Sequence, residues 1–110
     1  MNAPHSFAQG TIYFFSDSRA LALIFTRRGI PTKIGEWALR LFEPPRFEIG
    51  YVGNVSPDAP YQIEVDGHGI PIETMAGWCD NVATCLRDNG IRFDLTHFAA
   101  EGEEIRVYEA

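Results

Sequence analysis

The stretch TMAGWCDNVATCLRDNGIRFDLTH, residues 74–97, decides the fold, because its periodicity changes at a glycine. From about Thr74 to Asn89 hydrophobic residues recur at helical spacing and fall within an arc of about 100°, which predicts an amphipathic helix. These residues are Met75, Trp78, Cys79, Val82 and Leu86. After the turn signal Asn89-Gly90, residues 91–97 alternate between hydrophobic and polar, as half-buried strands do. The stretch therefore predicts a helix packed against a sheet.

The same order of elements occurs earlier in the chain. Residues 11–15 predict a central strand, Ser16-Asp17-Ser18 supplies a helix N-cap, and residues 19–28 predict a first helix. This helix ends at Gly29-Ile30, just as the second ends at Gly90-Ile91, with glycine at the position that favours left-handed backbone. Each half of the chain is thus predicted as strand, helix, Gly-Ile corner, strand, turn and strand.

Further segments predict the rest of the sheet. Each alternates hydrophobic and polar residues over a length typical of strands. The segments are residues 33–42, 46–52, 61–65 and 104–108. The turn signal Glu43-Pro44-Pro45 joins the first two into a hairpin, and Gly35, which shifts the alternation, indicates a bulge.

Two segments are predicted to be irregular. Residues 1–10 form a flexible lead-in to a single domain, residues 11–110, and the stretch 53–60, rich in glycine and proline, forms a loop inside that domain. Neither side of this loop is long enough to bury a core alone, so the loop is not a linker between domains.

These elements predict an α+β fold, in which a mainly antiparallel sheet carries two helices on one face in a two-layer sandwich. Short connections make successive strands antiparallel neighbours, and two amphipathic helices need one sheet face to cover. Over residues 11–109 the order resembles the ferredoxin-like plait or a βαββ-βαββ variant. It is more loosely similar to the βαβββ modules of the vicinal-oxygen-chelate (glyoxalase-like) enzymes. Because the resemblance rests on element order and the helix-Gly-Ile corner, it carries over no functional residue.

Composition limits the classes of function. The 110 residues are 45% hydrophobic and 22% charged, as is usual for a globular domain. The formal net charge is −6, and the chain lacks the basic stripe of nucleic-acid-binding proteins. No hydrophobic stretch approaches the ~18 residues that span a membrane, and the N-terminus does not resemble a signal peptide. We expect a cytoplasmic protein that binds neither nucleic acid nor membrane.

The sequence contains no familiar catalytic motif. Cys79 and Cys85 would lie roughly 9 Å apart along one helix, too far for a disulfide, so two free thiols are predicted. The stretch Gly67-His68-Gly69 lacks the lysine and hydroxyl residue of a phosphate-binding loop, and no serine stands in a nucleophile-elbow context. We therefore expect no cofactor and do not favour an enzyme.

One enzymatic hypothesis remains, a metal site formed by His68, Glu73 and His97. Two imidazoles and a carboxylate can hold iron, zinc or manganese and leave positions open for substrate. Such a site would suit a glyoxalase-like enzyme or small-ligand binder, which is our alternative function. His97 shares a strand face with Phe93 and Leu95, however, and this favours a histidine buried in the core.

A sheet covered on one face leaves its other face for a partner. The residues predicted on that face combine aromatic rings with charges, a composition typical of interfaces. They are Tyr13, Phe15, Glu36, Arg40, Phe42, Glu48 and Glu64, with Ile12 and Phe14 as the alternative to Tyr13 and Phe15. The alternative role of the charges is a cross-strand ion pair of Arg40 with Glu36 or Glu48.

The main functional prediction is a small acidic protein-binding module, such as an inhibitor, immunity or adaptor protein. Its acidic charge predicts a partner with a basic surface, attracted electrostatically. Homodimerisation through the sheet is the alternative, because exposed clusters of large rings are rare on monomers.

Overall fold

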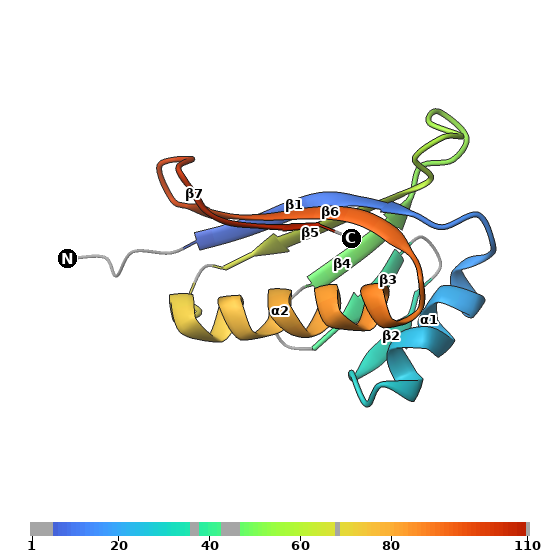
Figure 1. Ribbon diagram of the computed structural model, residues 1–110, viewed down its shortest axis with the longest axis horizontal. Helices are drawn as coiled ribbons and strands as arrows, with labels where there is room; N and C mark the ends of the chain where they lie inside the picture. The colour runs from blue at the N-terminus through green and yellow to red at the C-terminus, as the bar shows by residue number, and fades with distance from the viewer. Residues whose placement is uncertain (1–5, 36–37, 43–46, 68, 110) are drawn as a thin grey trace.

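The computed structural model describes residues 6–35, 38–42, 47–67 and 69–109, which form one seven-stranded sheet and two helices. In chain order the elements are β1 (Ser6–Tyr13), α1 (Ser18–Arg27), β2 (Thr32–Ile34), β3 (Ala38–Leu41), β4 (Phe47–Tyr51), β5 (Tyr61–Asp66), α2 (Ile72–Asp88), β6 (Arg92–Ala99) and β7 (Glu104–Glu109). The strands lie in the order β2-β3-β4-β5-β1-β6-β7, and every neighbouring pair is antiparallel. Both helices lie on the same side of the sheet (Figure 1). The predicted α+β class is confirmed, whereas the ferredoxin-like plait stays a prediction.

The predicted strand 33–42 is in fact a hairpin. Its two strands, β2 and β3, pair with Thr32 opposite Leu41. The amide of Gly35 donates to the carbonyl of Ala38 at 2.8 Å, so this glycine lies in the turn and not at a bulge. The shift of alternation at Gly35 correctly indicates that the strand is interrupted there, but a turn and a bulge both produce such a shift.

The first strand is longer than the sequence indicates. Because β1 begins at Ser6, residues 6–10 belong to the sheet and the predicted lead-in is wrong for them, while residues 1–5 lie outside the described part of the chain. The inward positions are Ser6, Ala8 and Gly10. Such small side chains give no hydrophobic alternation, and this hid the strand from the sequence analysis.

Both helices end in the same hydrogen-bonded corner. The amide of Ile30 donates to the carbonyl of Phe25 after α1, and the amide of Ile91 donates to the carbonyl of Leu86 after α2. The glycine before each isoleucine has a positive φ, 84° and 67° respectively, as the Schellman motif requires. The repeated Gly-Ile corner is therefore confirmed. Among the described residues, no helix has the length and hydrophobicity needed to cross a membrane.

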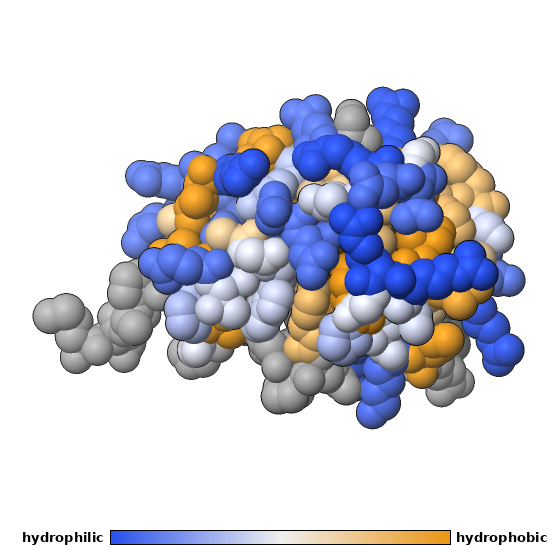
Figure 2. All heavy atoms as spheres, turned by 60° about the horizontal axis from the view of Figure 1, so that its bottom comes forward, coloured by the Kyte–Doolittle hydropathy of each residue, from blue (hydrophilic) through white to orange (hydrophobic). Residues whose placement is uncertain are grey.

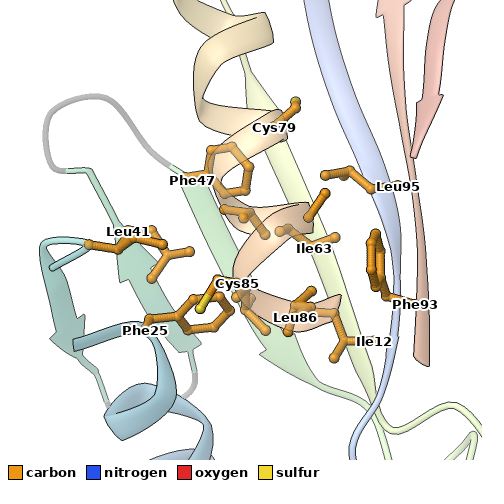
Figure 3. Close-up of a cluster of buried hydrophobic side chains, with 14 of the residues drawn as sticks. Ile12, Phe25, Leu41, Phe47, Ile63, Cys79, Cys85, Leu86, Phe93 and Leu95 are labelled. Carbon is orange, nitrogen blue, oxygen red and sulfur yellow. The ribbon is translucent and has the colours of Figure 1, made fainter. Parts of the chain in front are cut away.

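The hydrophobic core fills the space between the helices and the inward face of the sheet. It takes side chains from both helices and from β1, β3, β4, β5, β6 and β7. In Figure 3, Cys79 and Leu86 of α2 lie over a layer that includes Ile63 and Phe93 of the sheet. Burying a large hydrophobic side chain stabilises a fold by about 1.5–3 kcal/mol, so this layer fixes which sheet face is covered.

The other face of the sheet, which we name the open face, is covered by no segment that the structure describes. Burial alternates accordingly along β5, where Ile63 is buried and Gln62 and Glu64 are exposed. Residues that pair across antiparallel strands share a face, so the register identifies the larger side chains there. They are Phe7, Gln9, Thr11, Tyr13, Lys33, Arg40, Glu48, Gln62, Glu64, Asp66, Arg92, Asp94, Thr96, Phe98, Val107 and Glu109.

Candidate functional site

Charges on the open face are ordered across the strands. One row of cross-strand neighbours spans the sheet from β2 to β7, through Lys33, Arg40, Glu48, Glu64, Gln9, Thr96 and Val107. The row changes from two cations through two carboxylates and two polar residues to a hydrophobic edge. Arg40 Nε lies 3.4 Å from Glu48 Oε1, which confirms the predicted cross-strand ion pair. Glu64 lies directly opposite Glu48, and like charges in that position repel.

In the described part of the chain, three hydrophobic side chains lie toward the β7 edge of the open face. The rings of Phe7 and Phe98 pair across β1 and β6 and stack at 5.0 Å with an interplanar angle of 18°. Val107 of β7 is 43% exposed. We name Phe7, Phe98 and Val107 the hydrophobic patch. Asp66 is the neighbour of Phe7 on its other side, so a carboxylate borders the patch.

Tyr13 lies on the open face, where it was predicted, at the end of β1. Its hydroxyl donates to Asp94 Oδ2 at 3.3 Å, and the guanidinium of Arg92 lies 5.2 Å from its ring centre. The hydroxyl of Tyr13 thus has a hydrogen-bond acceptor, and its ring has a cation–π partner. Arg40, Glu48 and Glu64 also lie on the predicted face.

Phe42 lies on the helix side, so its predicted placement on the open face is wrong. Its ring stacks on Trp78 of α2 at 5.5 Å and meets Phe47 edge-on at 5.8 Å. The cause is local, since Phe42 follows the last residue of β3 and has a φ of 56°, which takes it out of the alternation. Glu36 lies outside the described residues.

Phe15 belongs to a different site, a pocket of about 740 Å³ that we name the end pocket. It lies where β1 ends, α1 begins and the loop from β4 to β5 returns, on the right in Figure 1. Among the described residues, four aromatic side chains line it, Phe14, Phe15, Tyr51 and Tyr61, together with Asp17. Sequence reasoning missed this site, because the site depends on the strand order, which brings together residues that are far apart in the chain. The available signal was a tyrosine on either side of the loop 52–60.

His97 is fully buried on β6, as the core interpretation predicts. Its Nε2 lies 2.7 Å from Ser6 Oγ, and its Nδ1 has no hydrogen-bond partner among the described residues. Burial lowers the pKa of this imidazole. Glu73 is exposed in the first turn of α2, and His68 lies outside the described residues. Within the described part of the chain, no three metal-ligating side chains are grouped as a metal ion requires.

Burial of His97 predicts a pH-dependent stability. The pKa of His97 in the folded protein is lower than its ordinary value near 6.5. As the pH falls through 6.5, His97 therefore takes up a proton in unfolded chains but not in folded ones. Stability is then lost on acidification, by at most about 1.4 kcal/mol per pH unit from this group. We expect the double variant Ser6→Ala/His97→Leu to lose less unfolding free energy than wild type between about pH 7.5 and about pH 5.5. Urea denaturation at several pH values measures this, and equal losses in both proteins would contradict it.

The cysteines offer no reactive group. Cys79 and Cys85 are free and buried, and burial raises the pKa of Cys79 to about 12. A thiol needs a depressed pKa and access to solvent to act as a nucleophile. Both cysteines are therefore core residues on the inward side of α2.

No protein-family model, no curated protein and no solved structure matches this chain. The function is therefore inferred from the open face and the end pocket.

Proposed function

We propose that the protein is a protein-binding module whose open face captures a partner with hydrophobic side chains beside lysine or arginine. The observation that carries the proposal is the hydrophobic patch on a sheet face that no described segment covers. Phe7 and Phe98 are already stacked on each other. Their rotamers are therefore restricted before binding, which reduces the entropy lost at an interface.

The charges around the patch support a basic partner. Asp66 borders Phe7, and Glu109 lies two residues beyond Val107 on the same side of β7. Glu64 faces the like charge of Glu48, and a cation from a partner would relieve that repulsion. The net charge of −6 would also accelerate the encounter with a basic surface.

The helical side of the molecule provides a contrast. Figure 2 looks onto that side, where hydrophilic residues cover most of the view and hydrophobic ones form small groups. Among the described helical residues, only Leu23 is a large hydrophobic residue that is exposed. The outer surface of the helices therefore suits contact with water, and it supplies matched control positions.

The proposal is tested first by crosslinking. A photoreactive amino acid replaces Thr96, which lies between Gln9 and Val107 on the open face, or Asp80, on the exposed side of α2. We expect the residue at position 96, and not the one at 80, to crosslink a protein with a basic surface in the cell of origin. Crosslinking of the same proteins from both positions would contradict a specific docking face.

A pair of charge-reversal variants then tests whether the carboxylates of the open face attract the partner. Glu64→Lys/Glu109→Lys changes the open face, and Glu73→Lys/Asp80→Lys changes the charge of the helical side by the same amount. We expect the first variant to bind the crosslinked partner more than tenfold more weakly, about 1.4 kcal/mol, and the second to bind as wild type does. Isothermal titration calorimetry measures both affinities.

Two results would count against the proposal. Equal affinities of the two variants would show that the open face is not the site. A dimer that dissociates only in Glu64→Lys/Glu109→Lys, measured by size exclusion with mass detection, would replace the basic partner with a second copy of this chain.

A further inference from the structure

We propose that the end pocket binds a small organic cation, an alkylated ammonium group attached to a short hydrophobic or hydroxylated chain. Its volume of about 740 Å³ falls within the range of about 300–1,000 Å³ that small-molecule sites occupy. Its lining combines aromatic rings with one carboxylate. Aromatic faces attract alkylammonium groups because the ring quadrupole is negative above and below the plane.

The aromatic rings stand at angles to one another, as a cage requires. Tyr51 meets Tyr61 at 5.3 Å with an interplanar angle of 70°, and Phe14 meets Tyr61 at 6.1 Å with an angle of 53°. Tyr61 is only 2% exposed and so forms the floor of the pocket, whereas Tyr51, which is 53% exposed, stands at an angle to it as a wall. Phe15, which is 72% exposed, contributes a fourth ring that a ligand can reach from solvent.

Asp17 sets the sign of the charge that the pocket accepts. Among the described lining residues it is the only charged side chain. Its Oδ1 accepts a hydrogen bond of 2.8 Å from the amide of Ala20, so the chain's own carboxylate caps the first turn of α1. A helix N-terminus left uncapped would attract an anion, but here a bound anion would be repelled by Asp17. The carboxylate instead provides the counter-charge for a cation.

The field of Asp17 extends to the aromatic wall. Burial and then the negative charge of Asp17 raise the pKa of Tyr61, so the carboxylate lies close enough to affect the tyrosine hydroxyl. That hydroxyl donates to the carbonyl of Ser16 at 2.7 Å and so joins β5 to the connection between β1 and α1.

The pocket is held in shape before a ligand arrives. The Tyr61–Ser16 hydrogen bond fixes one wall, and the amide of Val52 donates to the carbonyl of Pro60 at 2.6 Å, closing the base of the loop from β4 to β5. Pro57 and Pro60 restrict the backbone of the same loop. Preorganisation of this kind lowers the entropic cost of binding.

The end pocket is separate from the docking surface proposed above. None of the larger open-face side chains lines it. Loss of partner binding at the open face and loss of cation binding in the pocket can therefore be measured independently.

The experiment compares three small molecules of nearly the same shape, added to the full chain. Choline carries the cation, 3,3-dimethyl-1-butanol is its neutral counterpart, and 3,3-dimethylbutanoate carries a negative charge. NMR titration of the ¹⁵N-labelled protein follows the amides of Asp17 and Asn54 in the pocket, with Val107 on the open face as an internal reference. We expect saturable shifts in the pocket with choline, binding at least about tenfold weaker for the neutral molecule, and no binding of the anion.

Two matched pairs of variants identify the groups responsible. Asp17→Asn removes the charge but keeps the N-cap, because asparagine and aspartate cap helices equally well. We expect this variant to keep its melting temperature and to bind choline about two- to fivefold more weakly, as the loss of an exposed charge pair usually does. Tyr51→Leu should weaken choline binding several-fold, whereas Tyr51→Phe, which keeps the ring, should bind as wild type does.

Several results would overturn the inference. Equal binding of choline and its neutral counterpart would make the pocket a hydrophobic site without preference for a cation, and so would unchanged choline binding by Asp17→Asn. The absence of saturable shifts with choline in the wild-type protein would remove the site altogether.

Discussion

Replacing Phe25 with alanine is expected to lower the free energy of unfolding by about 3–5 kcal/mol, the usual cost of removing a buried phenylalanine ring. Phe25 has no exposed surface. Figure 3 shows its side chain reaching from α1 into the core, close to Cys85 of α2. The truncation would leave a cavity where α1, α2 and the sheet meet, and small domains have only about 5–15 kcal/mol of stability in total.

The control is Phe15→Ala, the same change at a ring that is 72% exposed. This variant should stay within about 0.5 kcal/mol of wild type, as surface substitutions usually do. Urea denaturation, followed by circular dichroism, gives both values. A similar small loss in the two variants would mean that α1 does not hold Phe25 in the core.

Local signals predicted the helices well, because each depends on residues close together in the chain. Asp17 caps α1 through its side chain, as expected of an acidic residue before a hydrophobic stretch. The helical arc of α2 supplies Met75, Cys79 and Leu86 to the core. Periodicity also placed Glu48 and Glu64 on the correct sheet face, since alternate residues of a strand must face opposite ways.

Features that depend on distant contacts were missed. Phe7 lies in a segment whose inward residues are small, and Phe98 is one residue beyond the predicted strand 91–97, so their stacking was not foreseen. The end pocket joins Asp17 to Tyr51 and Tyr61, which are far apart in the sequence. A site of this kind follows from strand order, which a single sequence does not determine.

Gly10→Ala is expected to destabilise the fold by about 3 kcal/mol, the upper part of the usual range for overpacking. A methyl group at Gly10 would overlap the backbone carbonyl oxygen of Asp94 and would lie 2.7 Å from the Cα of Leu95. Both atoms belong to the backbone of β6, which pairs with β1 along its whole length. No flexible side chain can move aside, so the two central strands would have to separate.

Gly77→Ala makes the same chemical change where the expected sign is opposite. Gly77 lies within α2, and a methyl group there would meet no atom within 4 Å. Alanine in a helix interior is favoured over glycine by roughly 0.5–1 kcal/mol, so this variant should be more stable than wild type. Thermal and urea denaturation of the two variants measure the difference. Destabilisation by both would mean that glycine is needed in α2 for another reason, and stabilisation by both would mean that β1 and β6 do not approach closely at Gly10.

Because β1 and β6 also carry Phe7 and Phe98, strands that separate at Gly10 should disturb the stacked rings as well. We therefore expect Gly10→Ala, but not Gly77→Ala, to weaken binding at the open face even under conditions in which the variant is folded.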